Sequence, residues 1–141
     1  SDYLQKYSPY LSSSQIANLI KQGFFIGAHS TDHANFQEIP INQQIEKTVN
    51  SINYIKTNFN IDYSLFSFPF SDYYIPPSFF NQIKSIIPSI ITFGTSGLKI
   101  DSINTNFQRI SIEKNNSKNI IKSEVISYLI KKTFNKHIII R

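Results

Sequence analysis

The sequence contains no cysteine, no methionine and no tryptophan, and it has only four glycines and three histidines. Without cysteine there is no disulfide and no thiolate metal site, so any metal must be held by histidine, aspartate or glutamate. No apolar run approaches the roughly 20 residues that a membrane-spanning helix needs. The residues given also show no signal-peptide pattern of a charged start, an apolar stretch and a small-residue cleavage site.

The charge pattern disfavours nucleic-acid binding. The 14 lysines and arginines exceed the nine acidic residues, giving a formal net charge of +5. Apart from the adjacent pair Lys131 and Lys132, the lysines are scattered singly, and we see no clustered stripe that would neutralise a row of phosphates. With 40% hydrophobic and 14% aromatic residues over 141 positions, the chain can bury a core, so we expect one domain over residues 1–141.

The first half of the chain alternates between helical and strand-like patterns. Ser12–Ser14 can cap a short helix that ends near Gly23, and the apolar run Phe24–Ala28 predicts a strand covered on both faces. Pro40 can open a long helix with one apolar stripe. The stripe consists of Ile41, Ile45, Val49, Ile52, Ile55 and Phe59.

The second half continues the alternation. Tyr63–Phe68 and Ser89–Phe93 predict strands, separated by a short helix after Pro76 and Pro77. Phe107–Ile112 predicts a fourth strand, and a helix from about Lys118 to Phe134 should turn Ile121, Val125, Leu129 and Tyr128 inward. His137–Arg141 is a candidate closing strand. These patterns together predict an α/β fold with a parallel sheet or barrel, whose site lies at the carboxyl ends of the strands.

Two of the three histidines, His29 and His33, directly follow the first predicted strand. Imidazoles four residues apart on such a turn can hold one divalent ion, usually with a carboxylate as the third ligand. Such an ion polarises a carbonyl and activates water, which is the chemistry of amide or ester hydrolysis. The spacing alone equally fits ordinary surface or capping histidines.

The surrounding sequence resembles the polysaccharide deacetylase family, also called the NodB homology family or carbohydrate esterase family four. The resemblance runs from about Leu11 to Asp72. It consists of a helix ending in glycine, a strand, the motif "HSTDH" at His29–His33, a long helix, and a strand ending in the aromatic-proline-aromatic motif Phe68–Phe70. The segment "RISIE" from Arg109 is similar to a closing strand in one branch of the family.

The resemblance implies a (β/α) barrel that removes N- or O-acetyl groups from sugar polymers with a divalent metal, most often zinc. His29 and His33 would be metal ligands, and Ser30 would hold the shape of their loop. Phe68, Pro69 and Phe70 would form a wall of the substrate groove.

The sequence departs from the family pattern at three motifs. The paired aspartates of the first motif have no counterpart, so we expect a partial barrel without its first strand and helix. Ser64 stands where the family usually has an arginine, and Arg109 is our candidate catalytic substitute, with a solvent-facing arginine as the alternative. No Leu-x-His motif is present, and we interpret His137 as structural.

Two aspartates have open roles. Asp72 would bond a sugar hydroxyl in the groove or simply serve a turn, and the turn is the plainer interpretation. Asp32 lies within the histidine motif, where loop capping is favoured over metal contact.

The resemblance therefore implies a metal-dependent hydrolase, with zinc as the expected metal, that removes acetyl groups from an N- or O-acetylated polysaccharide or envelope glycan. The alternative is an inactive carbohydrate-binding or structural remnant of the same fold. The expected partner is a carbohydrate polymer rather than a nucleic acid or a membrane. By resemblance, the expected location is the cell envelope or the exterior of the cell.

Overall fold

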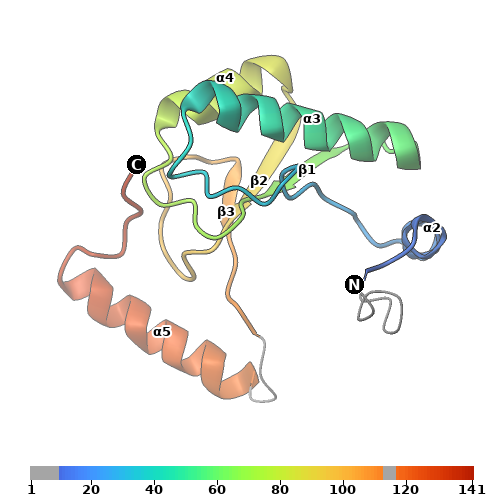
Figure 1. Cartoon of the computed structure of the whole chain (residues 1–141). Helices are drawn as coiled ribbons and strands as arrows, with labels where there is room; N and C mark the ends of the chain where they lie inside the picture. The colour runs from blue at the N-terminus through green and yellow to red at the C-terminus, as the bar shows by residue number, and fades with distance from the viewer. Residues whose placement is uncertain (1–9, 113–116) are drawn as a thin grey trace, which may run out of the picture.

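The computed structural model describes residues 10–112 and 117–141 of the chain (Figure 1). Within these ranges the protein is a mixed α/β structure with four helices and a small sheet. The helices are α2 (Ser13–Lys21), α3 (Ile41–Phe59), α4 (Pro77–Ile86) and α5 (Ser117–Thr133). The strands are β1 (Ser64–Ser67), β2 (Ile90–Gly94) and β3 (Asn106–Gln108).

The sheet is parallel, with the strand order β1-β2-β3. Ser64 pairs with Ile90 in β2, and Thr92 pairs with Asn106 in β3. Ala28 extends the sheet beyond β1 through one parallel bridge to Phe66. Because all strands run the same way, their carboxyl ends meet at one edge, as the alternating sequence pattern predicts.

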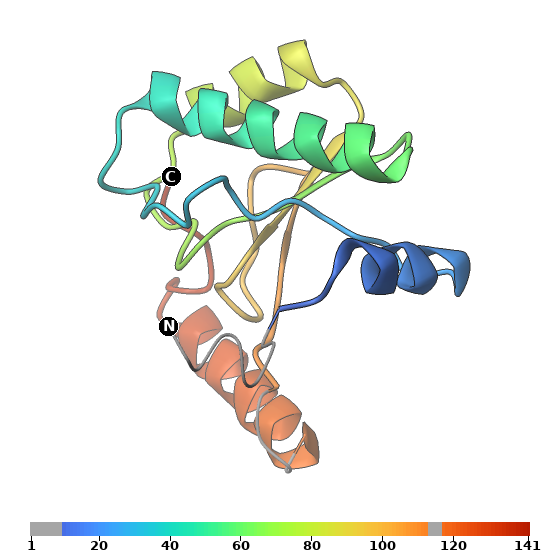
Figure 2. The same ribbon diagram turned by 45° about the vertical axis from the view of Figure 1, so that its right-hand side comes forward.

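The helices α3 and α4 lie side by side and cover one face of the sheet (Figure 2). Between them and the sheet lies a core rich in phenylalanine. Its fully buried aromatic residues are Phe36, Phe66, Phe68 and Phe79. Their rings meet at centroid distances of 5.3–6.2 Å, mostly edge to face, which is a favourable geometry for aromatic pairs.

Local sequence signals account for where the helices begin and end. Ser12 caps α2 in a reciprocal capping box with Gln15, and Gly23 follows the helix with a φ of 90°. Pro77 occupies the first turn of α4, where its missing N–H has no intrahelical partner to lose. The long helix α3 begins after Pro40, as predicted, and ends before Asn60, which adopts a left-handed conformation.

The buried face of α3 is more polar than its predicted apolar stripe. Gln44, Thr48 and Ser51 are buried beside Ile52, whereas the other aliphatic residues of the stripe are half-buried. Gln44 Nε2 donates to the carbonyl oxygen of Phe36 at 2.6 Å, and Thr48 Oγ1 donates to that of Gln44 at 2.8 Å. These hydrogen bonds allow polar side chains to replace aliphatic ones in the core.

The expected strand at Phe24–Ala28 is not formed. Only Ala28 pairs with the sheet, while 57% of Phe24 and 74% of Phe25 is exposed. In the described part of the chain, the last residue of this segment pairs with β1 on one edge, and its other residues pair with no strand. A continuous apolar run becomes a buried strand only where both of its faces are covered.

The expected strand at Phe107–Ile112 is shorter than predicted. It is limited to Asn106–Gln108, because its partner β2 ends at Gly94, which pairs with Gln108. The candidate closing strand at the end of the chain is likewise a single bridge, between Ile138 and Ile100. The described strands thus form an open sheet rather than a closed barrel.

The helix α5 has the predicted bounds but not the predicted buried face. Ile121, Val125 and Leu129 are 42–55% exposed, and Tyr128 is half-buried against the ring of His137. The apolar side chains are distributed around the helix, since Ile126 and Ile130 are also about half exposed. The expectation of one inward face was therefore wrong. Within the described ranges, none of the helices has the length and apolar character needed to cross a membrane.

Candidate functional site

The candidate site lies at the carboxyl edge of the sheet, where His29 follows the bridge at Ala28. Ala28 N–H donates to the Leu65 carbonyl oxygen, and its own carbonyl oxygen accepts from Ser67 N–H, both at 2.8 Å. These two bonds place the His29 side chain beside the end of β1. Its Nδ1 lies 2.9 Å from the carbonyl oxygen of Ser67.

The hydrogen bond to Ser67 determines the tautomer of His29. A carbonyl oxygen can only accept, so Nδ1 carries a proton, and in the neutral ring Nε2 is then the nitrogen with the lone pair. This is how a neutral imidazole is prepared to bind a metal through Nε2. The His33 ring lies 4.8 Å from the His29 ring, centroid to centroid, at an interplanar angle of 72°.

The loop between the two histidines contains two left-handed residues, Ser30 with a φ of 71° and His33 with a φ of 57°. Asp32 holds this loop closed: its Oδ1 accepts from Ser30 Oγ at 3.2 Å and from the N–H of Ala34 at 3.3 Å. Its Oδ2 pairs with Lys47 of α3 at 2.6 Å. The hydrogen bond from Lys47 is the main reason that the pKa of Asp32 lies below its ordinary value.

The residues present fit part of a metal site. The two imidazoles are suitable zinc ligands, and the bond to Ser67 sets the protonation that such a ligand requires. Asp32 is the nearest carboxylate in sequence, but it is bound to Lys47 and serves the loop. Within residues 10–112 and 117–141, no group of three or more histidine, cysteine, aspartate or glutamate residues is arranged to hold a metal.

The aromatic-proline-aromatic motif divides between the core and the surface. Phe68 and Pro69 are fully buried, whereas 61% of Phe70 is exposed. Phe70 has a φ of 55°, and its ring lies 4.7 Å from that of His33. A cavity of about 330 Å³ in this region is lined by His29, Phe68, Phe70, Thr95, Arg109, Ile110 and Ser111.

Arg109, the residue after β3, is among the residues that line this cavity. Its backbone N–H and its Nε both donate to the carbonyl oxygen of Gly94 at 3.1 Å. These two hydrogen bonds hold the Arg109 side chain as far as Nε. The residue is otherwise exposed at the cavity. Its catalytic role stays a prediction.

Asp72 is not positioned to bond a sugar hydroxyl, because its side chain is completely buried. Its Oδ1 accepts from Thr95 N–H at 3.2 Å, and its Oδ2 accepts from Asn106 and Gln108 at 2.9 and 2.8 Å. Arg141 Nη2 lies 2.9 Å from the same oxygen. Asp72 therefore ties together the residues that follow or end all three strands.

Arg141 was not identified by the sequence analysis, although it is one of only two arginines in the chain. Its guanidinium is 5% exposed and forms ion pairs with both Asp72 and Asp101. Burial is the largest single influence on the pKa of Asp72 and would raise it, but hydrogen bonds from Gln108, Arg141 and Asn106 hold it below its ordinary value of 3.8. Asp101 shows the same balance, with Arg141 as its main hydrogen-bond donor. The available signal was an arginine that follows three isoleucines in the segment "HIIIR".

The close approach of Asp72 requires glycine at the end of β2. A Cβ at Gly94 would lie 2.3 Å from Asp72 Oδ2 and 2.4 Å from its Cγ. We predict that Gly94→Ala lowers the free energy of unfolding by about 1–3 kcal/mol, because the buried carboxylate must shift. Urea denaturation measures this loss.

Gly27→Ala is the matched control for that substitution, because a Cβ there would meet Leu65 at 3.2 Å, a far milder contact. A Gly94→Ala variant as stable as Gly27→Ala would contradict the close contact.

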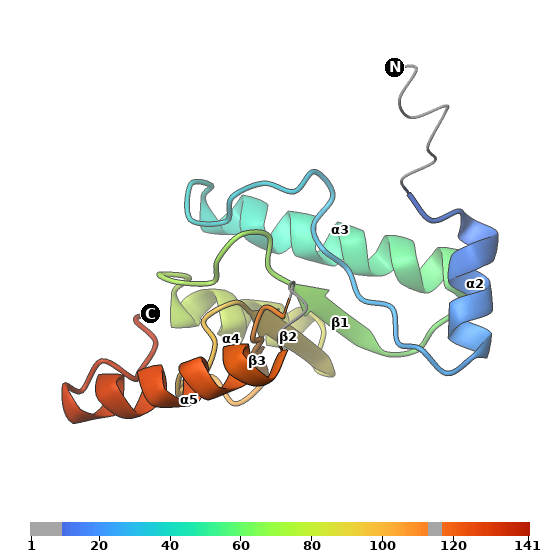
Figure 3. The same ribbon diagram turned by 90° about the horizontal axis from the view of Figure 1, so that it is seen from below.

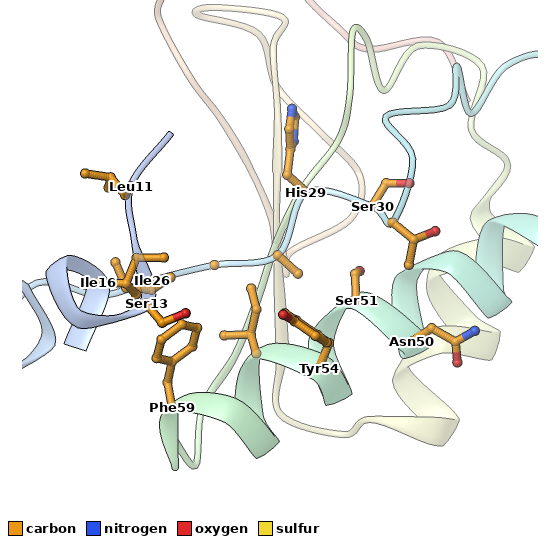
Figure 4. A pocket seen from close by; sticks show the side chains of 14 residues that line it. Leu11, Ser13, Ile16, Ile26, His29, Ser30, Asn50, Ser51, Tyr54 and Phe59 are labelled. Carbon is orange, nitrogen blue, oxygen red and sulfur yellow. The ribbon is translucent and has the colours of Figure 1, made fainter. Parts of the chain in front are cut away.

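A second, larger cavity of about 710 Å³ lies on the other side of the His29 segment, between α2 and α3 (Figure 4). It is mostly apolar, with Ile16, Ile26 and Phe59 among its lining residues, and it reaches His29 and Ser30 at one end. The histidine loop thus lies between an apolar cavity and the smaller cavity beside Phe70.

Comparison with known families places this site in context. The sequence model of the polysaccharide deacetylase family matches residues 2–77, which is more than half of the chain. The chain belongs to the polysaccharide deacetylase family. The matched residues include the histidine loop, α2, α3, β1 and the Phe68–Phe70 motif, and they end at the start of α4. The searches of curated proteins and of solved structures found no match.

Proposed function

We propose that this chain forms part of a zinc-dependent hydrolase that removes N- or O-acetyl groups from a polysaccharide. Membership of the family supports deacetylase-type hydrolysis. The observation that carries the proposal is the histidine pair, with His29 Nδ1 bound to Ser67 and the His33 ring 4.8 Å away. His29 and His33 are two of the ligands that we propose, and a third would come from outside the described residues.

A divalent metal in such a site supplies polarisation of the acetyl carbonyl and activation of water for its hydrolysis. The residues of this chain have supporting tasks. Ser67 keeps the proton of His29 on Nδ1, and Asp32, through Lys47, keeps the loop in the shape that points the two rings toward each other. The exposed ring of Phe70 offers a flat apolar surface to a sugar ring beside the histidines.

Three wider features belong to the same proposal. We propose that residues 1–141 belong to one deacetylase-like domain, that the three-stranded sheet is part of a (β/α) barrel, and that the protein acts at the cell envelope or outside the cell. The parallel strands with α3 and α4 on one face are consistent with a segment of such a barrel.

Zinc titration of the 141-residue chain by calorimetry tests the proposed site. We predict one-to-one binding that weakens by at least about tenfold in both His29→Ala and His33→Ala, because each removes a ligand. His137→Ala is the matched control, since that histidine packs against Tyr128 and is expected to leave zinc affinity unchanged.

Equal zinc affinity of the parent, His29→Ala and His33→Ala, or equal weakening by His137→Ala, would contradict the proposed ligands. Absence of zinc binding by the parent would contradict a complete zinc site within these 141 residues. A chain that binds acetylated glycan but no metal would instead be a carbohydrate-binding member of the family. Release of acetate from an N-acetylglucosamine tetramer, measured with and without added zinc, separates these two functions.

A further inference from the structure

A third cavity, of about 510 Å³, lies between the residues after β2, the residues after β3, and α5. Its lining includes three cationic side chains, Lys99, Arg109 and Lys131, and one carboxylate, Glu124. The helix α5, which carries Lys131, lies on the side of the molecule opposite α2 (Figure 3). This cavity is therefore distinct from the apolar one between α2 and α3.

The cationic cavity adjoins the cavity at the candidate site. Thr95, Arg109, Ile110 and Ser111 line both. The other wall of the smaller cavity is formed by His29 and Phe70. An extended ligand with one unit beside the histidines would therefore place a neighbouring unit among the cations.

The three cations outnumber the one carboxylate of this cavity, Glu124, so its lining carries a net positive charge. Glu124 Oε1 accepts from the N–H of Leu98 at 2.9 Å. The ion pairs in residues 10–112 and 117–141 involve Lys47 and Arg141 but none of the three cavity cations. Lys99 and Lys131 are both half-buried, which strengthens their field relative to a fully solvated charge.

Lys99 is also held in position by an aromatic side chain. Its Nζ lies 4.6 Å from the centre of the Tyr73 ring and donates to the Tyr73 hydroxyl. The ring and the hydroxyl of Tyr73 carry no charge, so this contact does not balance the charge of the ammonium. It gives the ammonium a defined place in the cavity wall. Tyr73 adds an aromatic face to the same cavity.

From these observations we infer that the cavity of Lys99, Arg109 and Lys131 binds an anionic group, a carboxylate or a phosphate, carried by the glycan on which the His29 site acts. The inference rests on the proposed function and narrows its substrate class to acidic polysaccharides. The hydroxyl and carbonyl oxygens of a neutral glycan would accept hydrogen bonds from these cations but would not balance their charge. A carboxylate or phosphate would form charge-assisted hydrogen bonds with them.

Three N-acetylglucosamine tetramers of equal length test the inference: the neutral sugar, a form oxidised to carboxylates at C6, and a form phosphorylated at C6. Their affinities for the metal-free chain are measured by calorimetry at low and high salt. We expect the acidic tetramers to bind about tenfold more tightly than the neutral one at low salt, with the preference declining as salt screens the charges. Comparison of the two acidic forms identifies the preferred anion.

The double variant Lys99→Gln/Lys131→Gln should reduce the affinity of the acidic tetramers to that of the neutral one and leave the neutral affinity unchanged. Lys84→Gln, on the exposed surface of α4, removes a lysine far from the cavity and should keep the preference. Equal binding of neutral and acidic tetramers by the parent would overturn the inference while leaving a glycan-binding function intact. Failure of all three tetramers to bind would overturn the glycan function and this inference with it.

Discussion

Replacement of Arg141 by methionine is expected to lower the free energy of unfolding by about 3–5 kcal/mol, the range found when one partner of a buried ion pair is removed. The Arg141 side chain is 5% exposed and pairs with two carboxylates that are 0% and 5% exposed. Methionine can fill the space of the aliphatic stem, but it leaves Asp72 and Asp101 facing each other without a cation. Urea denaturation followed by circular dichroism measures the loss.

Lys47→Met is the matched control for that measurement. The Lys47–Asp32 ion pair is shorter than the pair between Arg141 and Asp72, yet 52% of the Asp32 side chain is exposed to solvent. Exposed pairs contribute only about 0–1 kcal/mol, because water screens the attraction. An Arg141→Met variant no less stable than Lys47→Met would show that the buried network does not hold the sheet edge together.

The substitution Arg141→Lys tests whether the positive charge alone, or also the shape of the guanidinium, stabilises the fold. An ammonium restores the positive charge, but it cannot reproduce the three guanidinium nitrogens that bond Asp72 and Asp101 together. We expect its stability to fall between those of the parent and Arg141→Met. The guanidinium also lies 4.7 Å from the Phe80 ring, a contact that methionine and lysine would each alter.

The elements with local signals were predictable from the sequence. The starts of α3 and α4 follow from Pro40 and Pro77, and the capping box at Ser12 marks the start of α2. These signals act within one or two turns, so they do not depend on the rest of the fold. The histidine motif was predictable for the same reason, because its two rings lie on one short loop.

The features that depend on distant partners were not predictable in the same way. The run at Phe24 has a strand-like composition, but its exposure depends on what covers it. The polar face of α3 is buried because Gln44 reaches the backbone carbonyl of Phe36 across a turn. Arg141 lies 69 positions from Asp72 in sequence, and no local pattern indicates that Asp72 and Asp101 share its guanidinium.

Asp72→Asn is expected to displace Phe70 from His33 in addition to destabilising the fold. Asp72 bonds the N–H of Thr95, and Thr95 Oγ1 in turn donates to the carbonyl oxygen of Phe70 at 2.9 Å. Phe70 has a φ of 55°, a strained value for a bulky residue that needs such support. An amide presents one acceptor atom to donors that now share two carboxylate oxygens, so the chain of contacts to Phe70 loosens.

Asp101→Asn is the matched comparison, because Asp101 shares the Arg141, Asn106 and Gln108 partners of Asp72 but has no bond to Thr95. We expect both variants to lose about 3–5 kcal/mol of unfolding free energy as broken buried pairs. The effect of the nearby Phe70 ring on the His33 proton resonances, measured by NMR in the folded protein, should change in Asp72→Asn and persist in Asp101→Asn. Thr95→Val replaces the hydroxyl with a methyl group of similar size and should reproduce the His33 change with a smaller stability loss. If the His33 resonances shift equally in Asp101→Asn, or not at all in Thr95→Val, the path from Asp72 through Thr95 to the histidine loop is wrong, and the buried network supports the sheet alone.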